Sequence, residues 1–180
     1  MKKALLLAGV AAFVASNVSA VELVPYVGAD YNYTFSHWAN RFDSDGEFPG
    51  QYHSLTVVAG TKVTPYAGVE AFGEMSRDEN KRDIRTRTAA YGVDLLGYMP
   101  FGCYGEYELI GTAGMGRYYM KAKDKADGWR DSLHEWTYRL GGGFQYNITD
   151  TWAVRAMYRH EWVQGKTVGD KVSVGVRYHF

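Results

Sequence analysis

The chain ends in the stretch Lys171-Val172-Ser173-Val174-Gly175-Val176-Arg177-Tyr178-His179-Phe180. Every second residue from Val172 to Phe180 is apolar, and the residues between them are polar or glycine. Because successive side chains of a β-strand point to opposite faces of a sheet, this alternation predicts a strand with one apolar and one mostly polar face.

Seven further segments alternate in the same way upstream of this stretch. They are residues 23–34, 54–63, 66–75, 88–98, 103–120, 133–146 and 152–162. With residues 171–180 they predict eight antiparallel strands and an all-β fold. An aromatic content of 16% and a total of 21 glycines suit strands with close crossings better than helices.

The position of the charges indicates what the apolar faces contact. Arg117 is the only charged residue on the apolar faces of the eight predicted strands. A Lys or Arg on a lipid-facing barrel wall costs about 2–4 kcal/mol at the bilayer midplane and about 0–1 kcal/mol near the interface, and Arg117 lies near a strand end. A bulge at Gly114 or Gly116 is the alternative explanation, because it would change the alternation there.

The nearly charge-free apolar faces of the eight predicted strands therefore predict a closed eight-stranded transmembrane β-barrel. No segment beyond the N-terminus approaches the roughly 18 apolar residues of a membrane helix, so a membrane fold here must be a barrel. The alternative is a soluble barrel or sandwich with inward apolar faces. Its outer face should be richer in Lys, Glu and Asp than in Gly, Ser and Thr.

The N-terminus is typical of a cleaved signal peptide. Lys2 and Lys3 precede an apolar run from Ala4 to Val14, which is too short to span a membrane as a helix, and Ser19 and Ala20 fit a cleavage site. We therefore expect residues 1–20 to be removed and residues 21–180 to form the barrel. The whole chain has 20 basic and 20 acidic residues. This balance gives no indication of nucleic-acid binding.

The predicted connections alternate in length along the chain. Short ones at residues 64–65, 99–102 and 147–150 alternate with longer ones at about 35–51, 77–87, 121–132 and 164–170. Outer-membrane barrels have short periplasmic turns and longer external loops, so both termini are expected in the periplasm. Aromatic residues near the strand ends should form two interfacial girdles. The periplasmic girdle is predicted to contain Tyr66, Tyr98, Phe101, Tyr104, Tyr146, Trp152 and Phe180, and the outer one Tyr33, Tyr52, Tyr118, Trp136, Tyr158 and Trp162.

The leader, the eight alternating segments and the ending Val174-Gly175-Val176-Arg177-Tyr178-His179-Phe180 resemble the small outer-membrane β-barrel family of the OmpA/OmpX type over residues 21–180. The resemblance implies a bacterial outer-membrane location beside lipid and lipopolysaccharide. It also implies that Tyr178 and Phe180 belong to a signal read by the outer-membrane insertion machinery. Members of the family include anchors, adhesins, serum-resistance factors and a few lipid-modifying enzymes, so the resemblance does not specify an activity.

The predicted inward faces collect charges of both signs. They are Asp30, Lys62, Glu70, Glu74, Asp94, Glu106, Glu108, Glu135, Arg139, Arg155, Arg159, Glu161, Lys171 and Arg177. An eight-stranded barrel has room inside only for side chains, and buried charges persist when they are paired. We expect a structural ion-pair plug. A narrow gated path for ions or small solutes and a catalytic carboxylate pair are the alternatives.

Two of the long connections contain clustered basic residues that suit phosphate groups, such as those of lipopolysaccharide, or acidic host polymers. The candidates are Arg77, Lys81, Arg82, Arg85 and Arg87 in one connection and Lys121, Lys123, Lys125 and Arg130 in the other. Interleaved acidic residues favour the alternative of ordinary solvated loops.

Candidates for catalysis are few. The histidines show no metal-ligand spacing, no cofactor is indicated, and the single cysteine, Cys103, excludes an intrachain disulfide. His134 and His160 have the alternation and height that a Ser-His-carboxylate site on the lipid-facing wall would need. We expect a non-enzymatic structural or surface-interaction protein that acts through its external loops. A low-conductance passive channel is the first alternative, and a lipid-modifying enzyme is the second.

Overall fold

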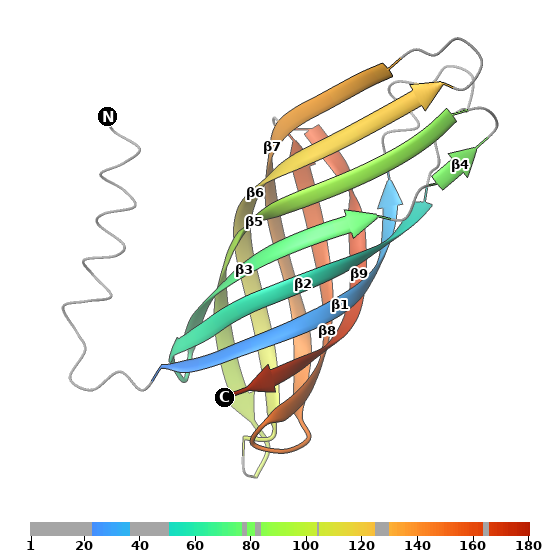
Figure 1. Ribbon diagram of the computed structural model, residues 1–180. Coiled ribbons are helices and arrows are strands. Elements are labelled where there is room, and N and C mark those ends of the chain that lie inside the picture. Colours follow the sequence, from blue (N-terminus) through green and yellow to red (C-terminus); the bar gives the residue numbers. More distant parts are fainter. Residues whose placement is uncertain are drawn as a thin grey trace, which may run out of the picture.

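The computed structural model describes residues 23–36, 51–76, 79–81, 84–103, 105–124, 130–163 and 166–180. These residues form antiparallel strands that tilt steeply around a common axis (Figure 1). The strands are β1 (Val24–Ser36), β2 (Gln51–Thr64), β3 (Ala67–Ser76), β4 (Glu79–Lys81), β5 (Ile84–Phe101), β6 (Tyr107–Asp124), β7 (Arg130–Asn147), β8 (Trp152–Val163) and β9 (Lys166–His179). The expected signal peptide lies outside the described residues.

Within the described ranges, no helix is both long enough and apolar enough to cross a membrane.

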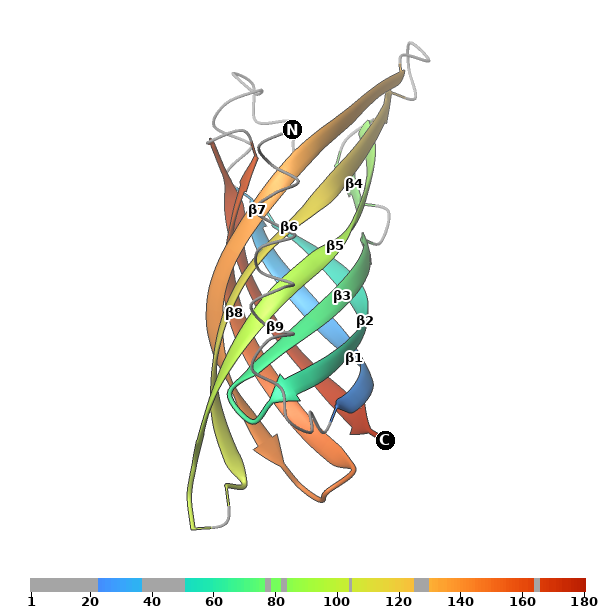
Figure 2. The same cartoon turned by 90° about the vertical axis from the view of Figure 1, so that its left-hand side faces the viewer.

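Eight long strands close into a ring. Each strand pairs with its neighbour in the order β3-β2-β1-β9-β8-β7-β6-β5, and β5 pairs back with β3, while the short β4 only extends the edge beside β5. The closure and the tilt are visible from the side (Figure 2). The predicted all-β, closed eight-stranded barrel is confirmed.

The closure is staggered. A row of cross-strand partners that starts at Ser76 on β3 passes once round the barrel and reaches Tyr98 on β5, whose backbone N–H donates to the carbonyl of Tyr66. Tyr66 precedes Ser76, the start of the row, by ten positions, so the row does not meet its own starting point when the ring closes. This stagger requires strongly tilted strands, and it determines which inward side chains meet across the interior.

The two ends of the barrel differ. The start of β1 and the end of β9 lie at one end, where the backbone N–H of Phe180 donates to the carbonyl of Pro25, 3.1 Å away (Figure 1). We call this the terminal end, and the opposite end, where β1, β3, β6 and β8 end, the loop end. The short β2–β3, β5–β6 and β7–β8 turns all lie at the terminal end.

Several predicted boundaries were wrong. β5 runs on to Phe101, so the turn comprises residues 102–106 rather than 99–102, and Gly102 and Gly105 supply its positive φ angles of 97° and 72°. Pro100 is tolerated inside the strand because it lies beyond the last β3–β5 pair and has only one neighbouring strand there. At the loop end β5, β6 and β7 extend past their predicted limits, and β4 occupies part of a predicted loop.

The alternation of faces is as predicted along every long strand. Outward side chains such as Leu55, Val57 and Val174 are more than half exposed, whereas the inward residues between them are buried. Arg117 faces outward, and the β5–β6–β7 pairing runs through it without a register shift, so the bulge alternative is wrong. Asp170 also faces outward, between Phe35 and His160, because β9 begins before the predicted limit.

The girdles are confirmed in part. Tyr66, Phe101, Tyr146, Trp152 and Phe180 at the terminal end are exposed on the outer wall, as are Trp136 and Tyr158 toward the loop end. Tyr98, Tyr52 and Tyr118 were assigned wrongly. All three point into the barrel and are at most 6% exposed.

Candidate functional site

The centre of the barrel holds an ion pair that connects opposite walls. Arg155 Nη1 on β8 lies 2.8 Å from Glu70 Oε2 on β3, and both side chains are fully buried. The ring order places three strands between β8 and β3 in either direction, so this contact spans the full width of the interior. Arg177 joins the same cluster, with Nη1 2.6 Å from Asp30 Oδ1 and Nε 3.5 Å from Glu70 Oε2.

A second group of charges lies beside this cluster. Arg139 on β7 makes two hydrogen bonds to the carboxylate of Asp94 on β5, and its guanidinium carbon lies 3.3 Å above the centre of the Phe72 ring. Arg159 lies between the two groups, 4.0 Å from Glu70 and 3.9 Å from Asp94, and donates to the hydroxyl of Ser173. It therefore links two carboxylates without pairing closely with either.

Ion pairs also cross the interior above and below the centre. Toward the loop end, Lys171 Nζ lies 2.7 Å from Glu74 and 2.8 Å from Glu161. Toward the terminal end, Lys62 Nζ lies 2.5 Å from Glu108, whose other oxygen accepts a hydrogen bond from Gln145. The β9–β3 and β2–β6 contacts both cross the barrel, because each joins strands that are not neighbours in the ring.

Two pairs of tyrosines also bridge the interior. The hydroxyl of Tyr26 donates to Glu70 and lies 3.2 Å from the hydroxyl of Tyr98, over whose ring Lys62 is placed. Near the loop end the hydroxyls of Tyr52 and Tyr118 are 3.5 Å apart. Each pair joins strands separated by two others, so the interior is bridged by rings near both ends.

Glycines leave space for the central arginines. Gly28 is the cross-strand partner of Arg177, and Gly141 is the partner of Arg159. A Cβ at Gly28 would lie 2.5 Å from Arg177 Cδ, and one at Gly141 would lie 2.9 Å from Arg159 Cγ. The large cationic side chains fit because the facing positions have no side chain.

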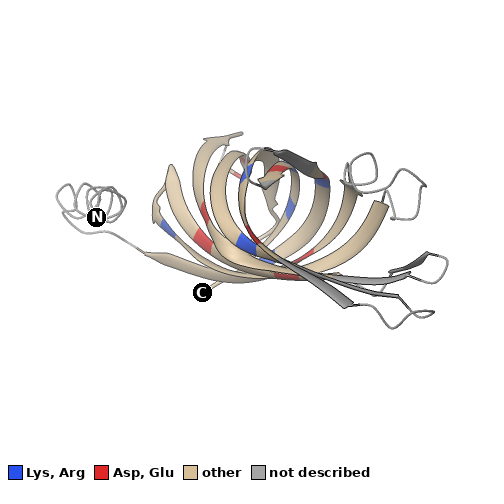
Figure 3. Ribbon diagram, turned by 90° about the horizontal axis from the view of Figure 1, so that it is seen from above, with Lys and Arg blue, Asp and Glu red and all other residues tan. Residues whose placement is uncertain are grey.

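Two of the predicted inward charges, Glu106 and Glu135, are less deeply buried than most of the others. Glu106 precedes β6 and is half-buried in the turn at the terminal end, where its carboxylate lies close to Gly102. Glu135 on β7 is also only half-buried. The other predicted inward charges form the pairs described above, and both signs are distributed around the wall in the view along the barrel (Figure 3).

The pairing is incomplete at the centre. Among the described residues, Glu70 Oε1, Arg155 Nη2, Arg159 Nε and Arg177 Nε are buried without a hydrogen-bond partner. All four atoms belong to the central cluster. A buried polar atom without a partner weakens the network to which it belongs.

The basic residues of the long connections lie largely outside the described part of the chain. This holds for the whole of Arg77, Arg82 and Lys125, and for the side chains of Lys81, Arg85, Arg87, Lys121, Lys123 and Arg130. The backbone register nevertheless makes Arg85 the partner of Lys123, and Lys123 the partner of Arg130. Three basic residues on β5, β6 and β7 thus occupy one row at the loop end.

The outer wall carries a polar cluster near the loop end. Asp170 accepts hydrogen bonds from Tyr158, at 2.5 Å, and shares one with His160 Nδ1, at 2.6 Å. The His160 ring packs edge-on against Trp162. His134, the other candidate, packs against Tyr119. Neither histidine is hydrogen-bonded to a serine among the side chains that the structure describes, which do not include that of Ser132.

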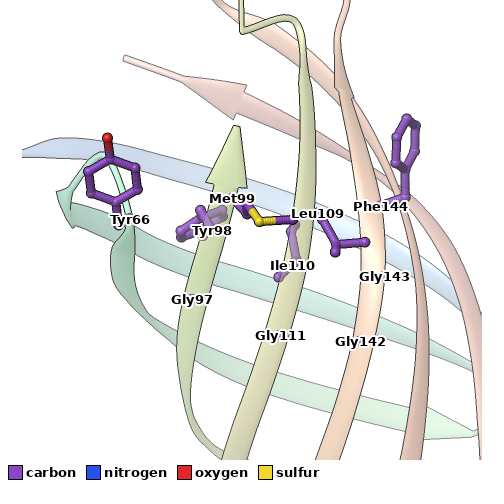
Figure 4. A pocket seen from close by; sticks show the side chains of 10 residues that line it. All are labelled: Tyr66, Gly97, Tyr98, Met99, Leu109, Ile110, Gly111, Gly142, Gly143 and Phe144. Atoms are coloured by element: carbon purple, nitrogen blue, oxygen red, sulfur yellow. The ribbon is translucent and has the colours of Figure 1, made fainter. Parts of the chain in front are cut away.

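A shallow groove of about 600 Å³ crosses the outer wall of β5, β6 and β7 toward the terminal end (Figure 4). Its floor is a row of paired glycines, Gly97, Gly111 and Gly142. Met99, Leu109 and Phe144 form one side. The lining is almost wholly apolar, and nothing in it suggests a reacting group.

The distribution of polarity is the reverse of that in a soluble protein, since the charges lie inside and a broad apolar band is exposed outside.

Solved structures of similar fold have the same architecture. Neisserial surface protein A is 13% identical over 88% of this chain and 97% of its own, with a TM-score of 0.65. The N-terminal β-barrel domain of Pseudomonas aeruginosa OprF is 12% identical over 87% and 97% of the two chains, with a TM-score of 0.66.

A third similar structure is Ail, the attachment invasion locus protein of Yersinia pestis, in complex with the heparin analogue sucrose octasulfate. It is 16% identical over 88% of this chain and 97% of its own, with a TM-score of 0.60. At these identities the likeness establishes the fold alone. Among curated protein sequences, none is similar enough to count as a match.

The sequence profile of one family covers nearly the whole chain. It describes the outer membrane protein beta-barrel domain and matches residues 4–180. The profile agrees with the closed barrel, the apolar outer wall and the charged interior. The chain therefore belongs to the outer membrane protein beta-barrel domain family.

Proposed function

We propose that this protein is a non-enzymatic surface-interaction protein of the bacterial outer membrane, whose barrel serves as a closed anchor and whose loop end binds anionic partners. The observation that carries the proposal is the burial of the inward charges. Glu70, Asp94 and Arg177 are 0% exposed and Arg155 is 1% exposed, although they lie where a pore would have to pass. Water-filled pores leave their lining charges accessible, so a closed interior directs function to the ends of the barrel.

The loop end is the more suitable end for a partner. Arg85, Lys123 and Arg130 are brought into one row across β5, β6 and β7 by the register. Clustered guanidinium and ammonium groups bind sulfate and phosphate groups well. The complex of Ail with a heparin analogue shows that a barrel of this fold can bind a polysulfated ligand, and we extend this chemistry to the present chain as a proposal.

Heparin binding tests this role. The full chain in lipid nanodiscs would be passed over immobilised heparin, and compared with a variant carrying Arg85→Gln, Lys121→Gln, Lys123→Gln and Arg130→Gln. We expect the affinity to fall by at least about fourfold, because the variant removes four exposed ion pairs that contribute about 0.2–1 kcal/mol each.

The matched control changes acidic residues of the same strand ends. Asp124→Asn together with Asp131→Asn should leave heparin binding unchanged or make it tighter. If the parent does not bind heparin, or the basic-residue variant binds it as the parent does, the loop end has no anion-binding role.

We further propose that the loop end is external, that both termini are periplasmic, and that residues 1–20 are a cleaved signal peptide. The short turns at the terminal end support this orientation. An epitope inserted between Asp43 and Ser44 should be reached by antibody on intact cells. An epitope inserted after Cys103 should be reached only after the outer membrane is opened, and the reverse pattern would invert the orientation.

Phe180, exposed at the end of β9 and packed edge-on against Tyr178, is suitably placed for contact with the insertion machinery.

A low-conductance channel is the second candidate. It is favoured by the unpaired polar atoms of the central cluster, where Arg159 lies about 4 Å from each of its two carboxylates. A small shift of these side chains would open polar surface along the axis. The conductance measurement described at the end of the Discussion distinguishes this candidate from the closed anchor.

A further inference from the structure

Five side chains form a patch on the outer wall of β5, β6 and β7 at the loop end. We call it the Arg117 patch, and it consists of Tyr91, Arg117, Tyr119, His134 and Trp136. The register aligns Tyr91 with Arg117 and Trp136, and Tyr119 with His134. Tyr91 and Trp136 are about half exposed, and the whole patch belongs to the surface that faces lipid.

The rings of the patch hold Arg117 against the wall. Its guanidinium carbon lies 4.8 Å from the centre of the Trp136 ring. A guanidinium stacked on an aromatic face keeps its N–H groups at the edge, where they are free to bind an oxyanion in a two-pronged manner. The arginine is thus oriented by its neighbour instead of extending freely toward water.

Hydrogen-bond donors surround the arginine. The hydroxyls of Tyr91 and Tyr119 are 2.9 Å apart, and only one of them can donate within that pair, so the other has a proton to donate outward. The rings of Tyr119 and His134 meet edge-on with centroids 4.8 Å apart. Arginine, phenol and imidazole groups therefore converge on one small area of the outer wall.

Among the side chains that the structure describes, none balances the charge of Arg117. In the described part of the chain no carboxylate pairs with it, whereas the other outward charge, Asp170, contacts both His160 and Tyr158. A cation on a lipid-facing wall is tolerated near the interface, and there it is stabilised by an anion at the same depth. The anions held at that depth are the phosphates of lipid headgroups.

We propose that the Arg117 patch binds the phosphate of a lipid headgroup in the leaflet at the loop end. The guanidinium of Arg117 binds two phosphate oxygens, and a tyrosine hydroxyl and His134 donate to the others. The proposal depends on the membrane-facing position of this wall and is independent of the heparin-binding role of the loops.

Quenching of Trp136 fluorescence tests the site directly. The probe is a full chain in which Trp38, Trp129, Trp152 and Trp162 are replaced by phenylalanine, reconstituted into phosphatidylcholine vesicles with added dibrominated phosphatidic acid. Bromine quenches only a neighbouring tryptophan, so quenching reports which lipid lies beside Trp136. Dibrominated phosphatidylcholine is the reference lipid against which phosphatidic acid is compared. We expect phosphatidic acid to be preferred at Trp136 by about fivefold, the upper range for one exposed ion pair. The preference should fall to about onefold in Arg117→Gln, since the charge is then absent.

Two controls define the site and its ligand. His53→Gln changes a polar outward residue near the same end but on β2, and should keep the preference for phosphatidic acid. Inorganic phosphate in the buffer should not relieve quenching. Relief by inorganic phosphate would mean that the patch binds the free ion and would overturn the proposal, as would a parent without lipid preference or an Arg117→Gln variant that retains it.

The result does not depend on the single-tryptophan variant folding. Folding of each variant is checked by its faster migration on a detergent gel before boiling. If the variant fails this check, native mass spectrometry of the unaltered chain and its Arg117→Gln form in equal amounts of phosphatidic acid and phosphatidylcholine replaces it. If only the unaltered chain retains phosphatidic acid, the result supports the site. If the unaltered chain and the Arg117→Gln variant retain it equally, the result contradicts the site.

Discussion

Arg155 and Glu70 meet at 2.8 Å in the middle of the barrel although their strands, β8 and β3, lie on opposite sides of the ring. The contact makes the two walls interdependent. Neither charge is exposed to solvent, so each needs the other, together with Arg177 and Tyr26, to offset the loss of hydration. The barrel is thereby closed by electrostatics as well as by its ring of backbone hydrogen bonds.

Removing one member of this pair should be more damaging than removing both. We expect Arg155→Met to lower the free energy of unfolding by about 3–5 kcal/mol, because it leaves a buried carboxylate without its main partner. Arg155→Met combined with Glu70→Met should recover much of that loss. Reversible urea unfolding in lipid vesicles would measure the double variant and the two single variants, Arg155→Met and Glu70→Met.

The control is an arginine outside the interior. Arg117→Met, on the outer wall, should change the unfolding free energy by less than about 1 kcal/mol. A double variant as unstable as the sum of the two single variants would show that Arg155 and Glu70 do not interact.

The outer wall predicts a strong dependence on depth. Val174 lies in the middle of β9 and is 55% exposed, so Val174→Arg should cost about 2–4 kcal/mol. Met75 is equally exposed but is the second-last residue of β3 at the loop end, and Met75→Arg should cost about 0–1 kcal/mol. Equal costs in vesicle unfolding experiments would show that this wall does not face lipid.

The glycines facing the arginines should resist even a methyl group. Gly28→Ala and Gly141→Ala would each place a Cβ within 3 Å of an arginine side chain, and we expect losses of about 1–3 kcal/mol in unfolding free energy from overpacking. Gly111, on the outer wall, has no atom within 4 Å of such a Cβ, so Gly111→Ala should be neutral or slightly stabilising. Similar effects at all three positions would mean that the interior is not tightly packed.

The faces of the strands could be predicted because the alternation is a local property. Val174 and Ser173 take opposite sides of β9 whatever their partners are. The partners themselves depend on the ten-position stagger of the ring, which no single strand encodes. For this reason the sequence placed Arg155 and Glu70 in one inward charge network but could not determine which carboxylate each arginine would contact.

The errors have similar causes. Tyr98 shares its alternation with Asp94, which was assigned to the interior, yet its position near a strand end suggested an interfacial girdle. Tyrosine fits either place, since its ring is apolar and its hydroxyl needs a partner, and here the partner is Tyr26. Asp170 was missed as an outward charge because β9 begins at Lys166, before the alternation becomes regular.

Single-channel recording in planar bilayers tests the central claim, that crossing ion pairs and tyrosines close the interior. We expect the unmodified protein to show at most rare, small openings, because the charged residues of the central cluster, Asp30, Glu70, Arg155, Arg159 and Arg177, are at most 3% exposed. Arg155→Ala should open more often, since water would enter to solvate Glu70. The matched variant Arg117→Ala, on the outer wall, should behave as the parent does. Steady, large conductance in the unmodified protein would contradict the closed barrel and make the channel its function.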